Sequence, residues 1–181
     1  MYDPGHRQLE MIMNLRNPST ILKVAILILS STLAANAADI LSDADKAFIA
    51  KVSQGGMYEV ELGTLAETKG ATQDIRDSGN TEAHDHGLVG AKLKSIIEAN
   101  GLEFPKALND EFQTRLEKLK ALPSDKFDAA YVKDMKLIHD ADGAAFAKEA
   151  TGGTNPDLKA FAAETHRIVV RHLGELGAKA N

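Results

Sequence analysis

The sequence predicts an all-α protein, built as an up-and-down bundle of four long helices with one extra short helix. Three observations support this. Strong helix breakers are few, and the segments between them are rich in Ala, Leu, Lys and Glu. No segment alternates apolar and polar residues long enough to indicate a strand. In the long segments, apolar residues recur at alternating steps of three and four, which is the spacing of a buried helix face.

The first two helices are expected at residues 43–69 and 72–99. Ser42 is a favourable N-cap for the first helix, and the Asn100-Gly101 pair is a favourable end for the second. The buried face of the first helix is expected to hold Phe48, Val52, Gly55, Glu59, Leu62 and Ala66. That of the second is expected to hold Ile75, Gly79, Glu82, His86, Val89, Leu93, Ile96 and Asn100.

The remaining helices are expected at residues 108–121, 125–150 and 156–178. Ser124 and Asn155 stand where an N-cap is needed for the last two. The buried face of the fourth helix is expected to hold Phe127, Tyr131, Met135, Ile138, His139, Asp142 and Phe146. That of the fifth is expected to hold Leu158, Phe161, Thr165, Ile168, Val169, His172 and Leu176.

Composition excludes several classes of protein. The chain of 181 residues has no Cys, so disulfides, thiol catalysis and Cys-based metal sites are excluded. A net charge of -5 without a basic stripe argues against a nucleic-acid partner. No nucleophile elbow or phosphate loop is present, no substrate cleft follows from the pattern, and a non-enzymatic role is favoured. The acidic residues from Asp39 to Asp45 are expected to be solvated or to favour a helix N-terminus.

Residues 1–37 have the pattern of an export signal. Basic residues precede a short apolar run, which leads to the small-x-small sequence Ala35-Asn36-Ala37. The run is too short for a membrane span, so no transmembrane anchor is expected after cleavage. We therefore expect one domain over residues 38–181, in a periplasm or outside the cell. The polar opening is long for such a signal, and Met11 or Met13 would be a more ordinary start than Met1.

Each long helix places one potential metal ligand on its expected buried face: Glu59, His86, His139 and His172. An ionised Glu in an apolar interior is costly unless it is paired or bound to a metal. Three imidazoles and one carboxylate suit iron, zinc, copper or manganese. Glu82, Asp85 and Asp142 are candidates for further ligands or for orienting the imidazoles. His84 and His166 fit the buried faces less well. His84 is expected to be solvated, and His166 is expected to lie at the flank of its helix's buried face.

Several short motifs resemble those of one family, in the order Glu59-Val60-Glu61-Leu62-Gly63-Thr64-Leu65-Ala66, Asp85-His86, Gly101 to Pro105, Phe127-Asp128-Ala129-Ala130-Tyr131 with Met135 and His139, and His172-Leu173. They resemble the exported bacterial ferritin-like bundles named domain of unknown function 4142, over about residues 43–176. The resemblance implies a ferritin-like bundle, export and a frequent description as an outer membrane protein, but no activity. The chain departs from the family at Glu82, where Met is usual, and at Thr165-His166, where Leu-Pro is usual.

Two functions are therefore open. The buried Glu and His hold a transition metal between the helices, for storage, sensing or oxidative protection, with oxidation at an open metal centre as a less favoured variant. Alternatively they form a structural hydrogen-bond network in a non-catalytic envelope or stress-related interaction module. Pattern alone names no protein partner.

Overall fold

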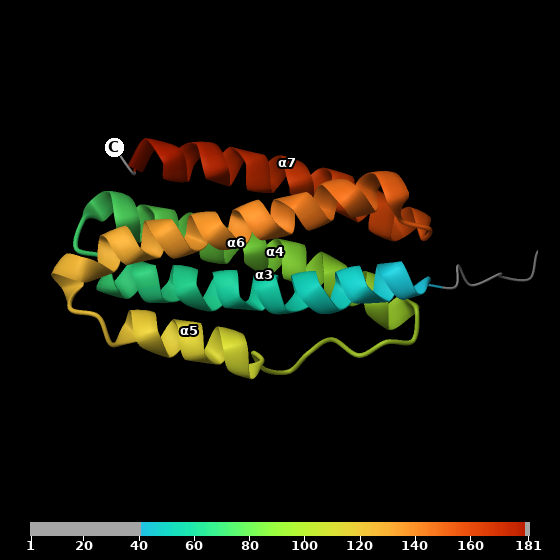
Figure 1. Ribbon diagram of the computed structural model, residues 1–181, viewed down its shortest axis with the longest axis horizontal. Helices are drawn as coiled ribbons and strands as arrows, with labels where there is room; N and C mark the ends of the chain where they lie inside the picture. The colour runs from blue at the N-terminus through green and yellow to red at the C-terminus, as the bar shows by residue number, and fades with distance from the viewer. Residues whose placement is uncertain (1–40, 180–181) are drawn as a thin grey trace, which may run out of the picture. The chain divides into compact units, whose positions relative to one another are not determined.

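The computed structural model describes residues 41–179, and this part of the chain is all-helical (Figure 1). Five helices occupy it: α3 (Asp43–Lys69), α4 (Gln73–Ala99), α5 (Asp110–Lys120), α6 (Ser124–Gly152) and α7 (Pro156–Lys179). The predicted all-α class is confirmed, and each predicted helix is confirmed to within two residues at each end. The predicted export signal at 1–37 lies outside the described residues.

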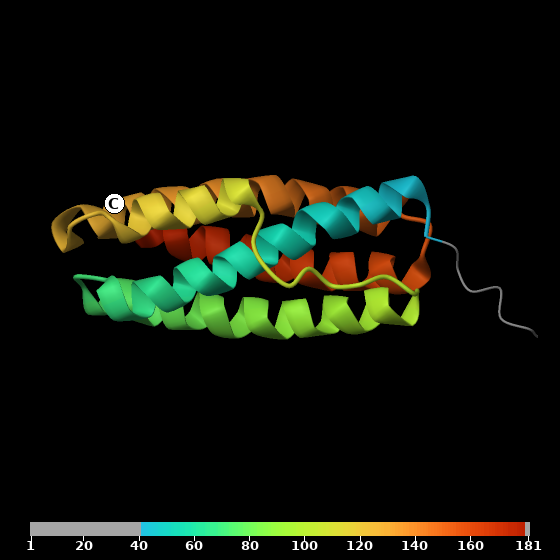
Figure 2. The ribbon, with the colours of Figure 1, turned by 90° about the horizontal axis from the view of Figure 1, so that it is seen from below.

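The four long helices lie lengthwise beside one another, and α5 lies along the outside of α3 (Figures 1 and 2). α3 packs on α4 and on α6, and α7 packs on α6 and on α4. None of the helices in residues 41–179 combines the length and the apolar content needed to cross a bilayer.

Local capping explains where the helices begin and end. Ser42 and Asp45 form a reciprocal capping box at the start of α3. Asn155 accepts hydrogen bonds from the backbone of the first turn of α7. α4 ends at Ala99, and two residues later Gly101 has a φ of 76°, the left-handed conformation that Gly adopts without strain. The prediction of Ser124 as an N-cap was wrong by one residue, because Pro123 holds that position and Ser124 is the first helical residue.

The buried residues form two apolar clusters with a polar layer between them. One cluster contains Leu62, Ile75 and Ile138, and the other contains Leu93, Phe146 and Val169. Along α4, α6 and α7 the chain passes from one cluster to the other through buried Glu or His residues. The predicted faces of α3 and α6 are confirmed. On α4, Ile97 rather than Ile96 is buried, and Val89 and Asn100 are only half-buried, as is Ile168 on α7. The helices therefore place their polar residues in the middle of the core.

α3 and α4 approach each other closely where Gly63 faces Gly79. A Cβ added at Gly63 would lie 2.7 Å from the carbonyl oxygen of Gly79, and one added at Gly79 would lie 2.5 Å from that of Gly63. Both distances are too short for real Cβ atoms, so this contact requires glycine on both helices. The neighbouring Gly56 has no such role, because nothing lies within 4 Å of a Cβ built there.

α5 covers Tyr58 at the side of the bundle. The ring of Phe112 stacks on that of Tyr58 with a centroid distance of 4.9 Å. Arg115 lies over Tyr58, 4.8 Å from its ring centroid, and pairs with Asp134 at 3.0 Å. The short helix thus completes the burial of α3 against α6.

Asp45 is fully buried, so the expectation that the acidic run is solvated was wrong at this position. Its carboxylate accepts hydrogen bonds from the backbone of Ser42 at 2.8 Å and from that of Thr154 at 3.0 Å. It joins the start of α3 to the α6–α7 turn. Burial and the adjacent Asp45 carboxylate raise the pKa of Glu149 to about 7. Glu149 therefore keeps its proton in mildly acidic solution and donates to Asp45.

We expect Glu149 to make the folded protein less stable as pH rises from about 4.5 to 7. Its folded pKa lies above the unfolded value, so the native state binds more protons in this window and loses stability as the pH passes through it. Glu149→Gln, which keeps the hydrogen-bond donor, should flatten this slope and gain about 1–2 kcal/mol at pH 8 relative to pH 5. Urea unfolding at both pH values measures the difference. Equal slopes in the two proteins would contradict this assignment.

Candidate metal centre

Three imidazoles and one carboxylate meet inside the bundle. Glu82 and His86 come from α4, His139 from α6 and His172 from α7, and all four are buried. Because Glu82 and His86 are four residues apart on one helix, their side chains project from the same face. Each of the four residues offers one atom to a common centre, and these atoms all lie within 4.8 Å of one another.

The distances fit the coordination shell of a small cation. Glu82 Oε2 lies 3.4 Å from His86 Nε2, 3.2 Å from His139 Nε2 and 2.8 Å from His172 Nδ1. His139 Nε2 lies 3.3 Å from His86 Nε2 and 3.2 Å from His172 Nδ1. In a regular tetrahedral site with bonds of about 2.0–2.1 Å, neighbouring ligand atoms are about 3.3 Å apart. Four of these separations are therefore close to the tetrahedral value, and the one between Glu82 and His172 is shorter.

The outer nitrogen of each imidazole faces an oxygen acceptor. His86 Nδ1 lies 3.0 Å from Glu59 Oε2, His139 Nδ1 lies 2.9 Å from the carbonyl of Met135, and His172 Nε2 lies 3.1 Å from Asp85 Oδ2. Since Glu59 and the Met135 carbonyl only accept, the outer nitrogens of His86 and His139 carry the hydrogen and donate it. His172 Nε2 faces both the Asp85 acceptor and the Arg171 donor. In their neutral forms, the inner nitrogens of His86 and His139 then present a lone pair to the centre, as in histidines that ligate metals.

Arg171 completes the polar surroundings of His172. It pairs with Asp85, and its Nη2 also lies 2.9 Å from His172 Nε2. The guanidinium thus holds the Asp85 carboxylate in place at the edge of the cluster, where Asp85 is partly exposed.

The cluster requires positive charge at its centre. Burial opposes protonation of His86, but the carboxylates of Glu59 and Glu82 raise its pKa to about 10. Glu82 in turn keeps a pKa well below its usual range, because the nearby imidazoles outweigh the effect of burial. Glu82 Oε2 is buried without a well-formed hydrogen bond, although three nitrogens lie near it. The imidazole lone pairs at the centre and this oxygen repel one another unless protons or a metal cation lie between them.

The structure assigns the two predicted carboxylates different places. The three predicted imidazoles converge, but Glu82 rather than Glu59 supplies the oxygen at the centre. Glu59 is buried behind the rings, where its two oxygens lie 3.0 Å from His86 Nδ1 and 3.3 Å from His139 Nδ1. The i, i+4 spacing of Glu82 and His86 is the signal in the sequence that could have identified this pair.

The other polar candidates are also placed. Asp85 orients His172, which is one of the two roles expected for it. Asp142 lies outside the group and is 3.4 Å from Lys51, in space that Gly55 leaves open. His84 is exposed and His166 is half-buried, as expected.

A family model described as domain of unknown function (DUF4142) matches residues 30–178. No curated protein and no solved structure matches the chain.

Proposed function

Because the chain belongs to the DUF4142 family, whose description assigns no activity, we propose from the geometry that it binds one transition-metal ion through Glu82, His86, His139 and His172. The observation that carries the proposal is that three imidazole nitrogens and one carboxylate oxygen, all buried, converge within 4.8 Å of one another, with most of their separations near 3.3 Å. Zinc fits this N₃O set best, while iron, copper and manganese accept the same ligand types.

A site of this kind is closed. Four protein ligands fill a tetrahedral shell and leave no position for water or substrate, which is typical of structural sites rather than catalytic ones. The ligands are also buried, so a bound ion would be shielded from bulk solvent. The proposed role is therefore to hold or store the ion, and it is non-enzymatic.

The proposal includes the location and the detailed architecture. The leader-like residues 1–37 support export to a periplasm or to the exterior, followed by cleavage after Ala37. Four long helices side by side, three of which place metal ligands on their facing sides, support a ferritin-like four-helix arrangement. Because the chain has no Cys, no thiol of its own would compete with this site for a metal ion in such a compartment.

The test uses the untagged protein recovered from an exporting host. Its mass identifies the mature N-terminus, and elemental analysis is expected to show about one equivalent of metal. After chelation, zinc should bind more tightly at pH 8 than at pH 6, because the metal must displace protons held by His86. If added zinc, iron, copper and manganese all fail to bind and a chelator leaves the melting temperature unchanged, the cluster is a hydrogen-bond network instead.

A further inference from the structure

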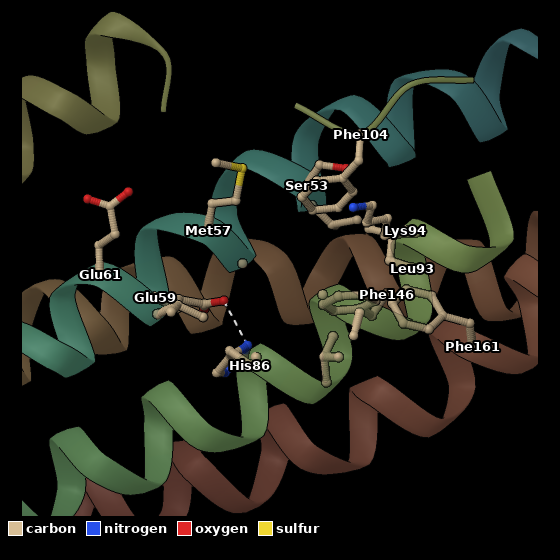
Figure 3. Close-up of a pocket in the computed structure, with 17 residues that line it drawn as sticks. Ser53, Met57, Glu59, Glu61, His86, Leu93, Lys94, Phe104, Phe146 and Phe161 are labelled. Atoms are coloured by element: carbon tan, nitrogen blue, oxygen red, sulfur yellow. Dashed lines mark ion pairs between the residues drawn. The ribbon is translucent and has the colours of Figure 1, made fainter. Parts of the chain in front are cut away.

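A second site lies beside the cluster, in a pocket between α3 and α4. Its volume is about 380 Å³, and most of its wall is apolar (Figure 3). Phe104, from the segment between α4 and α5, covers one end, near Phe146 and Phe161. A cavity of about 150 Å³ already accepts benzene, so this pocket has room for one or two fused rings.

Glycines on the two facing helices leave the pocket open. Gly56 on α3 and Gly90 on α4 line it, and nothing lies within 4 Å of a Cβ built at either position. Glycine inside a helix is less favourable than Ala by about 1 kcal/mol, and packing does not require it here. Glycine at these two positions therefore keeps the pocket open and does not serve a close contact between the helices.

The pocket also contains polar groups that suit a neutral hydroxyl. Ser53 is 1% exposed, lies beside Phe104, and its Oγ has no hydrogen-bond partner among the described residues. At the other end, Glu59 and His86 form part of the wall, joined by their ion pair (Figure 3). The basic side chains that line the pocket are already paired, His86 with Glu59 and Lys94 with Glu98, which disfavours an anion. A ligand O–H would instead pair with the buried oxygen of Ser53.

We propose that this pocket binds a small, uncharged aromatic alcohol of one or two fused rings. The rings lie among the three Phe side chains and the hydroxyl pairs with Ser53. The proposal stands on the pocket itself and does not depend on a metal in the neighbouring cluster.

The test compares 2-naphthol with 2-naphthoate, which have the same fused rings but differ in charge. Because the chain has no Trp, the fluorescence anisotropy of either compound can be read directly during titration with the full-length protein. We expect saturable binding of 2-naphthol, with 2-naphthoate binding at least about tenfold more weakly. Failure of 2-naphthol to saturate, or equal binding of the two compounds, would overturn the proposal.

Substitutions of the pocket glycines test whether 2-naphthol binds in this pocket. Gly90→Leu and Gly56→Leu should each weaken 2-naphthol binding by at least about tenfold, because a side chain then occupies the space. Gly174→Leu is the matched control, since Gly174 is also helical with nothing within 4 Å of a Cβ, and it does not line the pocket. Circular dichroism confirms that each variant folds, and metal content should stay unchanged. Equal affinity in all three variants would place the ligand elsewhere and overturn the proposal.

Discussion

Glu82→Gln is expected to abolish tight metal binding. The substitution keeps the size of the side chain but removes the charged oxygen, which lies 2.8–3.4 Å from all three imidazole nitrogens. We expect a loss of affinity on the order of a thousandfold, or about 4 kcal/mol. Competition with a chromophoric chelator measures it, and the loaded variant should lose the rise in melting temperature that metal gives the unaltered protein.

Glu59→Gln provides the sharp comparison. Glu59 contacts the outer nitrogens of His86 and His139, so its removal should weaken binding by about 10–100-fold, as for residues that orient ligands. Glu61→Gln, on the exposed side of the same helix, should change nothing. A greater loss from Glu59→Gln than from Glu82→Gln would show that Glu59 is the ligand and that Glu82 only orients the rings.

Gly79→Ala is expected to destabilise the protein by about 2–4 kcal/mol. The new Cβ would lie 2.5 Å from the carbonyl oxygen of Gly63 and 2.6 Å from the backbone nitrogen of Glu67. Backbone atoms cannot rotate away as a side chain can, so α3 and α4 must separate and lose packing. Urea unfolding followed by far-UV circular dichroism measures the change.

Gly90→Ala is the opposite case on the same helix. A Cβ there meets nothing within 4 Å, so only helix propensity changes and stability should rise by about 0.5–1 kcal/mol. The two substitutions should therefore differ in sign. A neutral Gly79→Ala would mean that the helices are further apart at this point than the contact with Gly63 requires.

The helices could be predicted closely because their ends are encoded locally. Capping side chains such as Ser42 and Asn155, and Gly101 in its left-handed conformation, act within a few residues of each boundary. The burial of Asp45 could not be predicted in this way. Its partners Thr154 and Glu149 are distant in sequence and reach it only when α3 packs beside the α6–α7 turn.

The site shows where helical periodicity stops being informative. Periodicity selected Glu59 and Glu82 as residues on buried faces, and both are buried. Which of them reaches the centre depends on the axial shift between α3 and α4 and on side-chain direction, neither of which the spacing contains. The three imidazoles were easier to predict, because α4, α6 and α7 each offered one histidine on the buried face. The pocket depends on Phe104, which lies outside any helix, and no pattern indicated it.

The layer of Glu and His between the two apolar clusters joins positions that are far apart along the chain. The contact between His86 and His139 spans 53 residues, and that between His139 and His172 spans 33. A cation held there would close two large loops in a chain that has no Cys, as a pair of disulfides would in another protein. Because α4, α6 and α7 would all have to release it before they separate, bound metal should slow unfolding more than it speeds folding. The same layer that is least favourable as a core would then set the lifetime of the folded state.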